Sequence, residues 1–290
     1  MSTATSITAT LETPTTSRRR RPLWLRLGII TAGLYLLLAI LSALFPSVLA
    51  PHDPYQVHMR AILAPPSSEH WLGTDESGRD VLSRLVYGAQ ASLAIGFGAT
   101  VLGVVAGSFF GLLSGLGPKW LDTLIMRAVD CLVAVPDILL ALIVITLVGG
   151  GTINTLIAVG IASIPGYARI IRAQTHQVRV SPYIEASRIL GLNRYEVAVR
   201  HVFPNAFRPL VSVIALRMGG AIGAGAGLSF LGLGAPPPQA EWGAMISTAR
   251  NFLLTDPMLV LWPALALTFT VVAVTVLARE IKQRLEGRSV

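Results

Sequence analysis

The chain has 290 residues, of which 53% are hydrophobic and only 13% are charged, and its mean hydropathy is +0.64. A soluble domain usually carries about a quarter charged residues, so this composition excludes an ordinary cytosolic enzyme, a disordered chain and a coiled coil. It favours an all-α polytopic membrane protein. Cys131 is the single cysteine, which excludes an internal disulfide. The formal net charge of +8 is better explained by membrane topology than by nucleic-acid binding.

The chain begins with a basic tail and a first apolar segment. Residues 1–22 are rich in Ser and Thr, end in an arginine run and are expected to be a disordered cytoplasmic tail. Residues 23–45 are the first predicted transmembrane helix, which is too long for the apolar part of a cleaved signal peptide. Residues 46–84 contain five prolines. Because proline interrupts regular helices, we expect this segment to lie outside the membrane on the extracytoplasmic side.

Residues 85–278 are expected to contain five further membrane spans. Each candidate approaches the ~20 apolar residues that a helix needs to cross the hydrocarbon core. The candidates are residues 89–113, 123–148, 154–171, 209–231 and 258–278. Pro136 and Pro165 are expected to kink the third and fourth spans. Six spans place both termini on one side of the membrane, and residues 279–290 form a second tail.

Arginine positions decide which side is the cytoplasm. The N-terminal tail, the segment 172–208 between spans four and five, and the C-terminal tail carry most of the positive charge, and all three fall on the same side. Positively charged loops remain in the cytoplasm. The sequence therefore predicts that both termini and the 172–208 loop are cytoplasmic.

Two spans carry glycines at intervals of four residues, which places them on one helix face. The first series is Gly103, Gly107, Gly111 and Gly115, and the second is Gly219, Gly223 and Gly227. Small residues at this spacing let a second helix backbone approach closely. We expect both series to serve helix packing; the alternative is that one faces a partner subunit across a moving interface.

Charged residues inside spans are costly and usually functional. Arg127 and Asp130 lie three residues apart near the start of span three, where they form either a mutual pair or a cytoplasmic gate. Arg217 lies about two turns into span five. It either extends to the cytoplasmic surface or lines a path through the bundle, where it would attract a carboxylate.

The extracytoplasmic segments offer few candidate sites. Asp75, Glu76 and Asp80 superficially resemble a calcium loop, but the third ligand and closing glutamate of an EF-hand are missing. No metal site and no catalytic residue are expected, and these side chains are expected to shape an outer gate or to dock another protein. Trp242 is expected either to anchor its loop at the membrane interface or to cover the outer mouth.

The 172–208 loop is longer than a helix connection requires. Ser181 is a candidate cap for a helix that begins at Pro182 and ends at Gly191. Asn193 and Glu196 have the spacing of a capping box for a second helix, which is expected to end before Pro204. Two short helices that project from a membrane are typical of a lever that docks into another protein.

The same loop carries the clearest family pattern. It reads Glu185-Ala186-Ser187, three residues, Gly191, nine residues, and then His201-Val202-Phe203-Pro204. This resembles the EAA loop of ABC importer permeases, which is Glu-Ala-Ala, three residues, Gly, nine residues, and Ile-x-Leu-Pro. Four further segments, in the same order along the chain, resemble the DppC-like branch of the dipeptide/oligopeptide/nickel permeases. They are residues 72–84, 126–136, 228–234 and 241–245.

The resemblance implies a type I ABC importer permease fold with six transmembrane helices in the bacterial cytoplasmic (inner) membrane. It implies four kinds of partner: a homologous permease, two ABC ATPases, an extracytoplasmic substrate-binding protein and membrane lipid. The chain has no GxxxxGK[ST] phosphate loop, so ATP and Mg²⁺ would be bound by the ATPases, and no cofactor is expected in this chain. The resemblance assigns ATPase coupling to Glu185, Ala186, Ser187, Arg188, Gly191 and Pro204.

Two departures and several alternatives stay open. The family often has a glutamate at the position of Gly225, so a carboxylate expected in the path is missing, and the C-terminal segment also differs. Dipeptides or oligopeptides are the first expected substrates, and nickel or a metal chelate is the second. A proton-coupled secondary transporter that uses Asp130 is a rival class, but such a protein does not need a cytoplasmic lever.

Overall fold

The computed structural model describes residues 23–285, and every regular element in that range is a helix. The predicted tail 1–22 and residues 286–290 lie outside the described residues. The helices are α1 Leu23–Leu44, α2 Pro46–Leu49, α3 Val81–Leu116, α4 Lys119–Val133, α5 Asp137–Val148, α6 Thr152–Arg179, α7 Pro182–Ile189, α8 Arg194–Val197, η1 Ala198–Val202, α9 Phe203–Phe230, α10 Trp242–Ala249, η2 Arg250–Phe252 and α11 Met258–Leu285.

Five helices are long and apolar enough to cross a membrane: α1, α3, α6, α9 and α11. The predicted third span, 123–148, is bent more sharply than a kink at Pro136 suggests, because α4 and α5 meet at an angle of 93°. Pro136 lies in the break, where its ring prevents the helix from continuing. The total is six if this bent pair is one span. Helix α11 continues into the predicted tail 279–290 and ends at Leu285.

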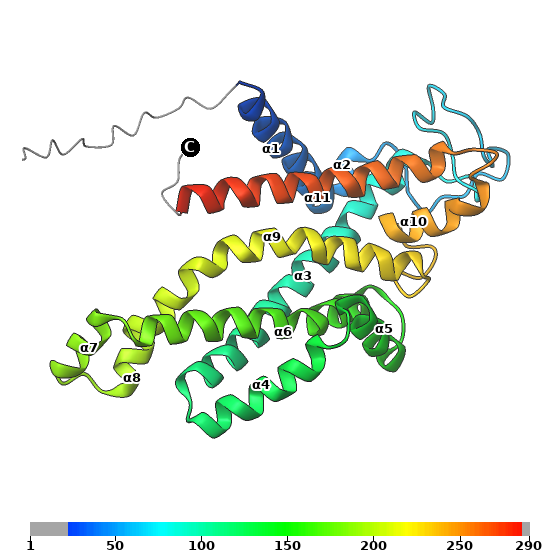
Figure 1. Cartoon of the computed structure of the whole chain (residues 1–290). Coiled ribbons are helices and arrows are strands. Elements are labelled where there is room, and N and C mark those ends of the chain that lie inside the picture. The colour runs from blue at the N-terminus through cyan, green and yellow to red at the C-terminus, as the bar shows by residue number, and fades with distance from the viewer. Residues whose placement is uncertain (1–22, 286–290) are drawn as a thin grey trace, which may run out of the picture.

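Figure 1 shows how the helices are arranged along the long direction of the molecule. The start of α1, the end of α11 and the pair α7–α8 lie at one end, which we take as cytoplasmic because it holds the basic segments. The 50–80 segment and α10 lie at the opposite end. Helix α3 packs against α1, α6 and α9 and is the central element of the bundle.

The first glycine series holds α3 and α6 in direct backbone contact. A Cβ atom on Gly107 would lie 2.5 Å from the Cβ of Tyr167, and one on Gly111 would lie 2.6 Å from the carbonyl oxygen of Ala168. Both distances are too short for any side chain. The expected packing role is therefore confirmed for this series, which faces a helix of the same chain.

The second glycine series is mostly open. A Cβ atom on Gly219 would lie 3.2 Å from Thr275 Oγ1 of α11, but one on Gly223 would meet no described atom within 4 Å. Packing inside the chain therefore does not explain Gly223.

The two series predict opposite effects of adding one methyl group. Gly111→Ala should lower the melting temperature of the protein in detergent, because overpacking of this kind costs about 1–3 kcal/mol. Gly223→Ala is the matched control in an open position, and it should leave the melting temperature of the isolated chain unchanged or slightly higher. Equal melting temperatures for the two variants would contradict the close α3–α6 contact.

Candidate functional site

The 172–208 loop folds into the two short helices that the sequence predicts. Helix α7 begins at Pro182, although the Ser181 hydroxyl donates to the carbonyl oxygen of Val178 instead of capping α7. Gly191 has a φ of +86°, which is the left-handed conformation that glycine adopts readily after a helix end. The capping box is confirmed: Glu196 N–H donates to Asn193 Oδ1 at 2.8 Å, and Asn193 N–H donates to Glu196 Oε2 at 3.2 Å.

The second helix was expected to end before Pro204, but it does not end there. It passes from α8 through the π-helical turn η1 directly into the spanning helix α9. Pro204 lies in the first turn of α9, directly after η1, so its missing N–H falls at the junction of the π-helical and α-helical segments. No non-helical linker separates α8 from α9.

A small apolar cluster fixes α7 to this assembly. Ile184 is 0% exposed and packs with Val197 and Val202, while Val178 at the end of α6 and Leu192 cover the cluster. Ser187 also faces inward, and its hydroxyl donates to the carbonyl oxygen of Tyr183. The cluster connects the end of α6, both short helices and the beginning of α9.

The outer face of the pair α7–α8 presents apolar side chains away from the protein. Ile189 is 81% exposed, Leu190 is 80% exposed, and Tyr195 is also exposed. Of the residues predicted to couple to ATPases, Glu185, Ala186, Gly191 and Pro204 are exposed, while Ser187 is buried. The side chain of Arg188 lies outside the described part of the structure. We call Tyr183, Ile189, Leu190 and Tyr195 the apolar tip.

A polar cluster joins the three helices α3, α4 and α6 close to this loop. Arg172 of α6 forms a bidentate pair with Asp122 of α4, with Nε–Oδ1 at 2.6 Å and Nη2–Oδ2 at 2.7 Å. The Ser114 hydroxyl of α3 also donates to Asp122. Sequence reasoning missed this cluster, because its members are widely separated along the chain and no local spacing marks them.

The charged residues predicted as gate or path have other partners than expected. Asp130 pairs with Arg169 of α6 at 2.6 Å, so the expected mutual pair between Arg127 and Asp130 is wrong. Arg127 is exposed. The guanidinium of Arg217 lies 5.4 Å from the ring centroid of Tyr167, a cation–π contact between α9 and α6.

At the extracytoplasmic end, three loops and α10 surround a cavity of about 420 Å³ with polar and apolar lining residues. Its lining includes the side chains of Arg79, Ser229 and Gln239 and the backbone of Gly150. Neither the Nε of Arg79 nor the hydroxyl of Ser229 has a hydrogen-bond partner among the described residues. We call this space the outer cavity.

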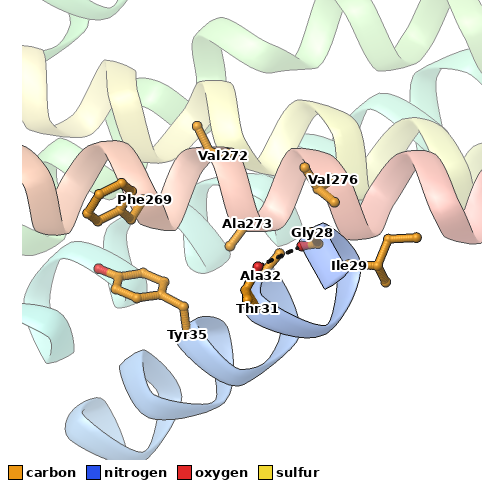
Figure 2. A pocket seen from close by; sticks show the side chains of 9 residues that line it. All are labelled: Gly28, Ile29, Thr31, Ala32, Tyr35, Phe269, Val272, Ala273 and Val276. Carbon is orange, nitrogen blue, oxygen red and sulfur yellow. Dashed lines mark hydrogen bonds between the residues drawn. The ribbon is translucent and has the colours of Figure 1, made fainter. Parts of the chain in front are cut away.

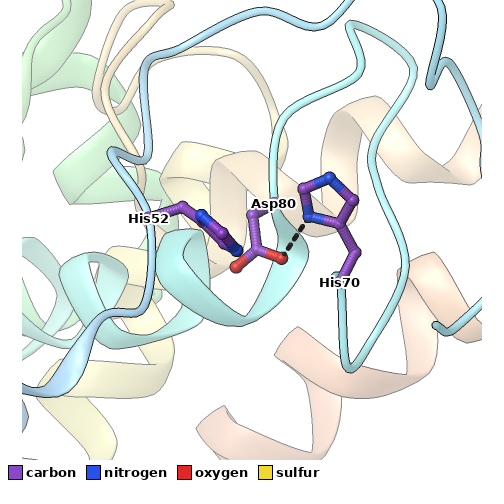
Figure 3. Close-up of side chains that lie close together, drawn as sticks. All are labelled: His52, His70 and Asp80. Carbon is purple, nitrogen blue, oxygen red and sulfur yellow. Dashed lines mark hydrogen bonds and ion pairs between the residues drawn. The ribbon is translucent and has the colours of Figure 1, made fainter. Parts of the chain in front are cut away.

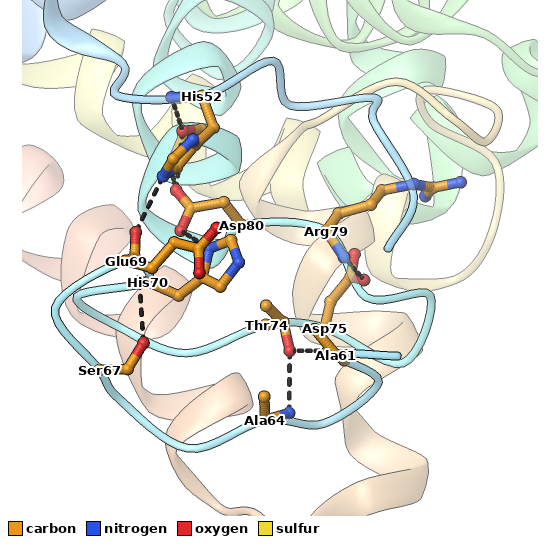
Figure 4. A network of polar contacts seen from close by, with 11 residues as sticks. His52, Ala61, Ala64, Ser67, Glu69, His70, Thr74, Asp75, Arg79 and Asp80 are labelled. Atoms are coloured by element: carbon orange, nitrogen blue, oxygen red, sulfur yellow. Dashed lines mark hydrogen bonds and ion pairs between the residues drawn. The ribbon is translucent and has the colours of Figure 1, made fainter. Parts of the chain in front are cut away.

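Buried polar contacts hold the wall of the outer cavity. Arg84 Nε lies 3.2 Å from Asp75 Oδ2, and its Nη1 donates to the carbonyl oxygens of Pro54 and Pro238 at 3.3 Å. Asp75 Oδ1 accepts backbone N–H groups of the same turn, and the Thr74 hydroxyl bridges Ala61 and Ala64 (Figure 4). Glu76 lines the outer cavity, whereas Asp75 is buried.

Two further expectations about this end are corrected. Trp242 is not an interfacial anchor: it is buried against Gly88 of α3, and its indole N–H donates to the carbonyl oxygen of Leu85 at 3.0 Å. Gly225 does not line a path, because its position faces Ile95 so closely that a Cβ atom would lie 2.4 Å from Ile95 Cγ2. A glutamate side chain does not fit there in this packing.

A second large cavity is unsuited to a polar substrate. It has a volume of about 550 Å³, lies between α1 and α11, and is lined almost entirely by apolar atoms (Figure 2). Its two hydroxyls are used within the chain, since Thr31 donates to Gly28 and Tyr35 donates to Ala266. The groove therefore offers no free polar group to a peptide.

One cluster at the extracytoplasmic end was not anticipated from the sequence. His52, His70 and Asp80 converge from separate parts of the 46–84 segment, with His70 Nδ1 3.0 Å from Asp80 Oδ1 (Figure 3). The histidines are distant from each other in the sequence and follow no metal-binding spacing, so only the folded loop brings them together.

Comparisons with known proteins agree with the fold. Residues 91–289 match the family of the binding-protein-dependent transport system inner membrane component. The chain is 40% identical over 261 residues to the glutathione transport system permease protein GsiD of Pectobacterium atrosepticum, covering 89% of this chain and 86% of that protein. It is 37% identical over 267 residues to the di/tripeptide transport system permease protein DppC of Pseudomonas aeruginosa, covering 90% and 88%.

Solved structures show the same fold at low sequence identity. An inward-facing structure of the MetNI methionine ABC transporter matches with a TM-score of 0.58 at 18% identity, over 70% of this chain and 96% of that one. The crystal structure of an amino acid ABC transporter with histidines matches with a TM-score of 0.56, over 69% and 94%.

The helical bundle with its cytoplasmic helix pair is thus the fold of an ABC importer permease, a multi-pass protein of the inner membrane. The chain belongs to the family of binding-protein-dependent transport system inner membrane components. It is the permease and not the ATPase, and membership implies that an ATPase and a substrate-binding protein act with it.

The buried ion pair beside the outer cavity makes a prediction about stability. Arg84→Met should lower the melting temperature in detergent, because it leaves the buried Asp75 carboxylate without its cation; breaking such a pair costs about 3 kcal/mol. Arg60→Met, at an exposed position of the same segment, is the control and should have no effect. Equal melting temperatures would show that the pair does not hold this end together.

Proposed function

We propose that the chain forms half of the translocation path of an ATP-driven importer of short peptides, including peptide-like molecules such as glutathione. The observation that carries this proposal is identity of 37–40% along nearly the whole chain to permeases of glutathione and di/tripeptide systems. The other half of the path is a homologous permease, and two ATPases supply the energy.

The outer cavity supports a substrate that carries a carboxylate. Every unmodified peptide ends in a carboxylate, and arginine binds this group in a planar bidentate geometry. Arg79 lines the cavity and its Nε has no partner among the described residues. The position at the extracytoplasmic end is where a binding protein releases its ligand.

The apolar tip supports docking of the ATPases. Exposed aromatic and aliphatic side chains outside the membrane are typical of protein–protein contacts. Ile189 and Leu190 are each about four-fifths exposed and lie at the cytoplasmic end. The tip is fixed by Ile184 to α6 and continuous with α9, so its displacement would move two spanning helices as rigid bodies.

Replacing one residue of the apolar tip tests this coupling. Leu190→Asp should reduce co-purification of the ATPases and uptake at least tenfold while leaving the melting temperature of the chain unchanged, because the side chain supports no internal packing. Leu254→Asp is the matched control: Leu254 is also solvent-facing but lies at the extracytoplasmic end. Normal ATPase binding by Leu190→Asp would contradict docking through the tip.

Substrate class is tested in proteoliposomes that contain the whole transporter and its loaded binding protein. Uptake of radiolabelled dialanine and glutathione should exceed that of Ni²⁺, and Arg79→Gln should raise the KM for dialanine at least fivefold. The same Arg79→Gln substitution should change the uptake of C-terminally amidated dialanine much less, because this substrate lacks the carboxylate. Arg60→Gln controls for loss of positive charge. Preferred uptake of Ni²⁺ would favour the metal alternative.

A further inference from the structure

We infer that His52, His70 and Asp80 form a binding site for a divalent transition-metal ion on the extracytoplasmic side of the protein. One potential ligand atom from each residue lies within 4.8 Å of the other two. In Figure 3 the two imidazole rings approach the Asp80 carboxylate from opposite sides. Two imidazoles and a carboxylate are the donor set of many zinc sites.

The three ligands come from separate parts of the 46–84 segment. His52 follows α2, His70 lies in the middle of the loop, and Asp80 is the N-cap residue of α3. His70 is 6% exposed and Asp80 is 2% exposed, so both are removed from bulk water. A metal ion here would join three points of a segment that has little regular structure.

The spacing of the rings fits metal coordination. At a tetrahedral zinc ion with Zn–N distances of about 2.0–2.1 Å, the centroids of two bound imidazoles lie about 5 Å apart. The ring centroids of His52 and His70 are 5.1 Å apart, which matches this value. The centroids of His70 and the neighbouring His58, which is not one of the three ligands, are 6.0 Å apart. At such an ion the ligand nitrogens lie about 3.3 Å apart, so binding would draw these ligand atoms, which now lie within 4.8 Å of one another, together by up to about 1.5 Å.

Contacts around the ligands hold them in place. Asp80 Oδ2 accepts from the backbone N–H of Ser83 at 2.8 Å and from its hydroxyl at 2.7 Å, which leaves Oδ1 directed at His70. Ser83 Oγ accepts from the backbone N–H of His52 at 3.0 Å. Such outer contacts orient metal ligands and sustain affinity. Ser83 thus fixes two of the three ligands to the first turn of α3.

The same contacts show which ring nitrogens have partners without a metal. His70 Nδ1 lies within hydrogen-bonding distance of Asp80, and His52 Nε2 lies 2.8 Å from the carbonyl oxygen of Glu69 (Figure 4). A metal ion binds a ring nitrogen through its lone pair, so a metal bond at either atom would replace the hydrogen bond that the atom makes now. Imidazole ligands select Zn²⁺, Co²⁺, Ni²⁺ or Cu²⁺ over Ca²⁺ and Mg²⁺.

The site is separate from the outer cavity, since none of its three ligands lines that cavity. Asp80 follows Arg79 directly, and Figure 4 shows the Arg79 side chain extending away from the histidines. Bound metal would therefore brace the turn that presents Arg79 without lying in the path. This role is structural and does not depend on which substrate is imported.

The test uses the purified full-length chain in detergent, carrying an affinity tag without histidines and treated with a chelator. Titration with Co²⁺ should give visible d–d absorption of a nitrogen- and oxygen-ligated ion at one equivalent per chain, and Zn²⁺ should displace it and raise the melting temperature. His70→Gln and His52→Gln should each weaken binding at least tenfold. His201→Gln, which changes a histidine of the cytoplasmic loop, should leave it unchanged.

Ser83→Ala is a second probe, because it leaves every ligand in place and should weaken Co²⁺ binding while the absorption band keeps its shape. His52→Gln also guards against a folding defect, since His52 is less buried than His70. The proposal is overturned if the wild-type chain binds no stoichiometric Co²⁺ at neutral pH. It is equally overturned if neither His52→Gln nor His70→Gln changes the affinity.

Discussion

Backbone contact between α3 and α6 along four glycines is the constraint on which the rest of the structure depends. Where Gly107 and Gly111 meet Tyr167 and Ala168, no side chain separates the two helices. Helices this close cannot slide or tilt independently, because protein interiors are packed as densely as organic crystals. Anything attached to the end of one helix is therefore fixed relative to the other.

The cytoplasmic end of this pair carries the loop, and polar contacts continue where the glycines end. Gly115 of α3 packs against Thr175, and its carbonyl oxygen accepts from Arg179 of α6. Asp122 then adds α4 through its bidentate pair with Arg172. Because charges near a membrane core are costly unless paired, such a cluster fixes the relative positions of three helices where force from the loop would enter.

How much the sequence predicts depends on how local the physical cause is. The capping box of Asn193 and Glu196, the left-handed Gly191 and the glycine strip of α3 each follow from residues within one or two turns, and all are confirmed. The break at Pro136 was expected as a kink, but its 93° angle depends on how α5 packs against α6.

Pairings between distant residues were beyond sequence reasoning. Arg127 and Asp130 have the right spacing for a pair, yet Asp130 pairs with Arg169 of α6. The packing of α4 against α6 brings these two side chains together, and the local sequence does not show this packing. Trp242 was expected as an interfacial anchor because tryptophan is common at membrane surfaces. Its burial against Gly88 depends on where α10 folds back, which the local sequence does not show. The cluster of His52, His70 and Asp80 is the extreme case.

The two ends of the bundle are built on different principles, and this difference is physically consistent with transport. The cytoplasmic helix pair is held by three buried aliphatic side chains, whose apolar contacts are non-directional. The outer segment is held by directional contacts of Asp75, Asp80 and Arg84, which lose their geometry if the loop shifts. Directional contacts thus fix the outer end, whereas apolar packing holds the cytoplasmic end, where α8 continues into α9.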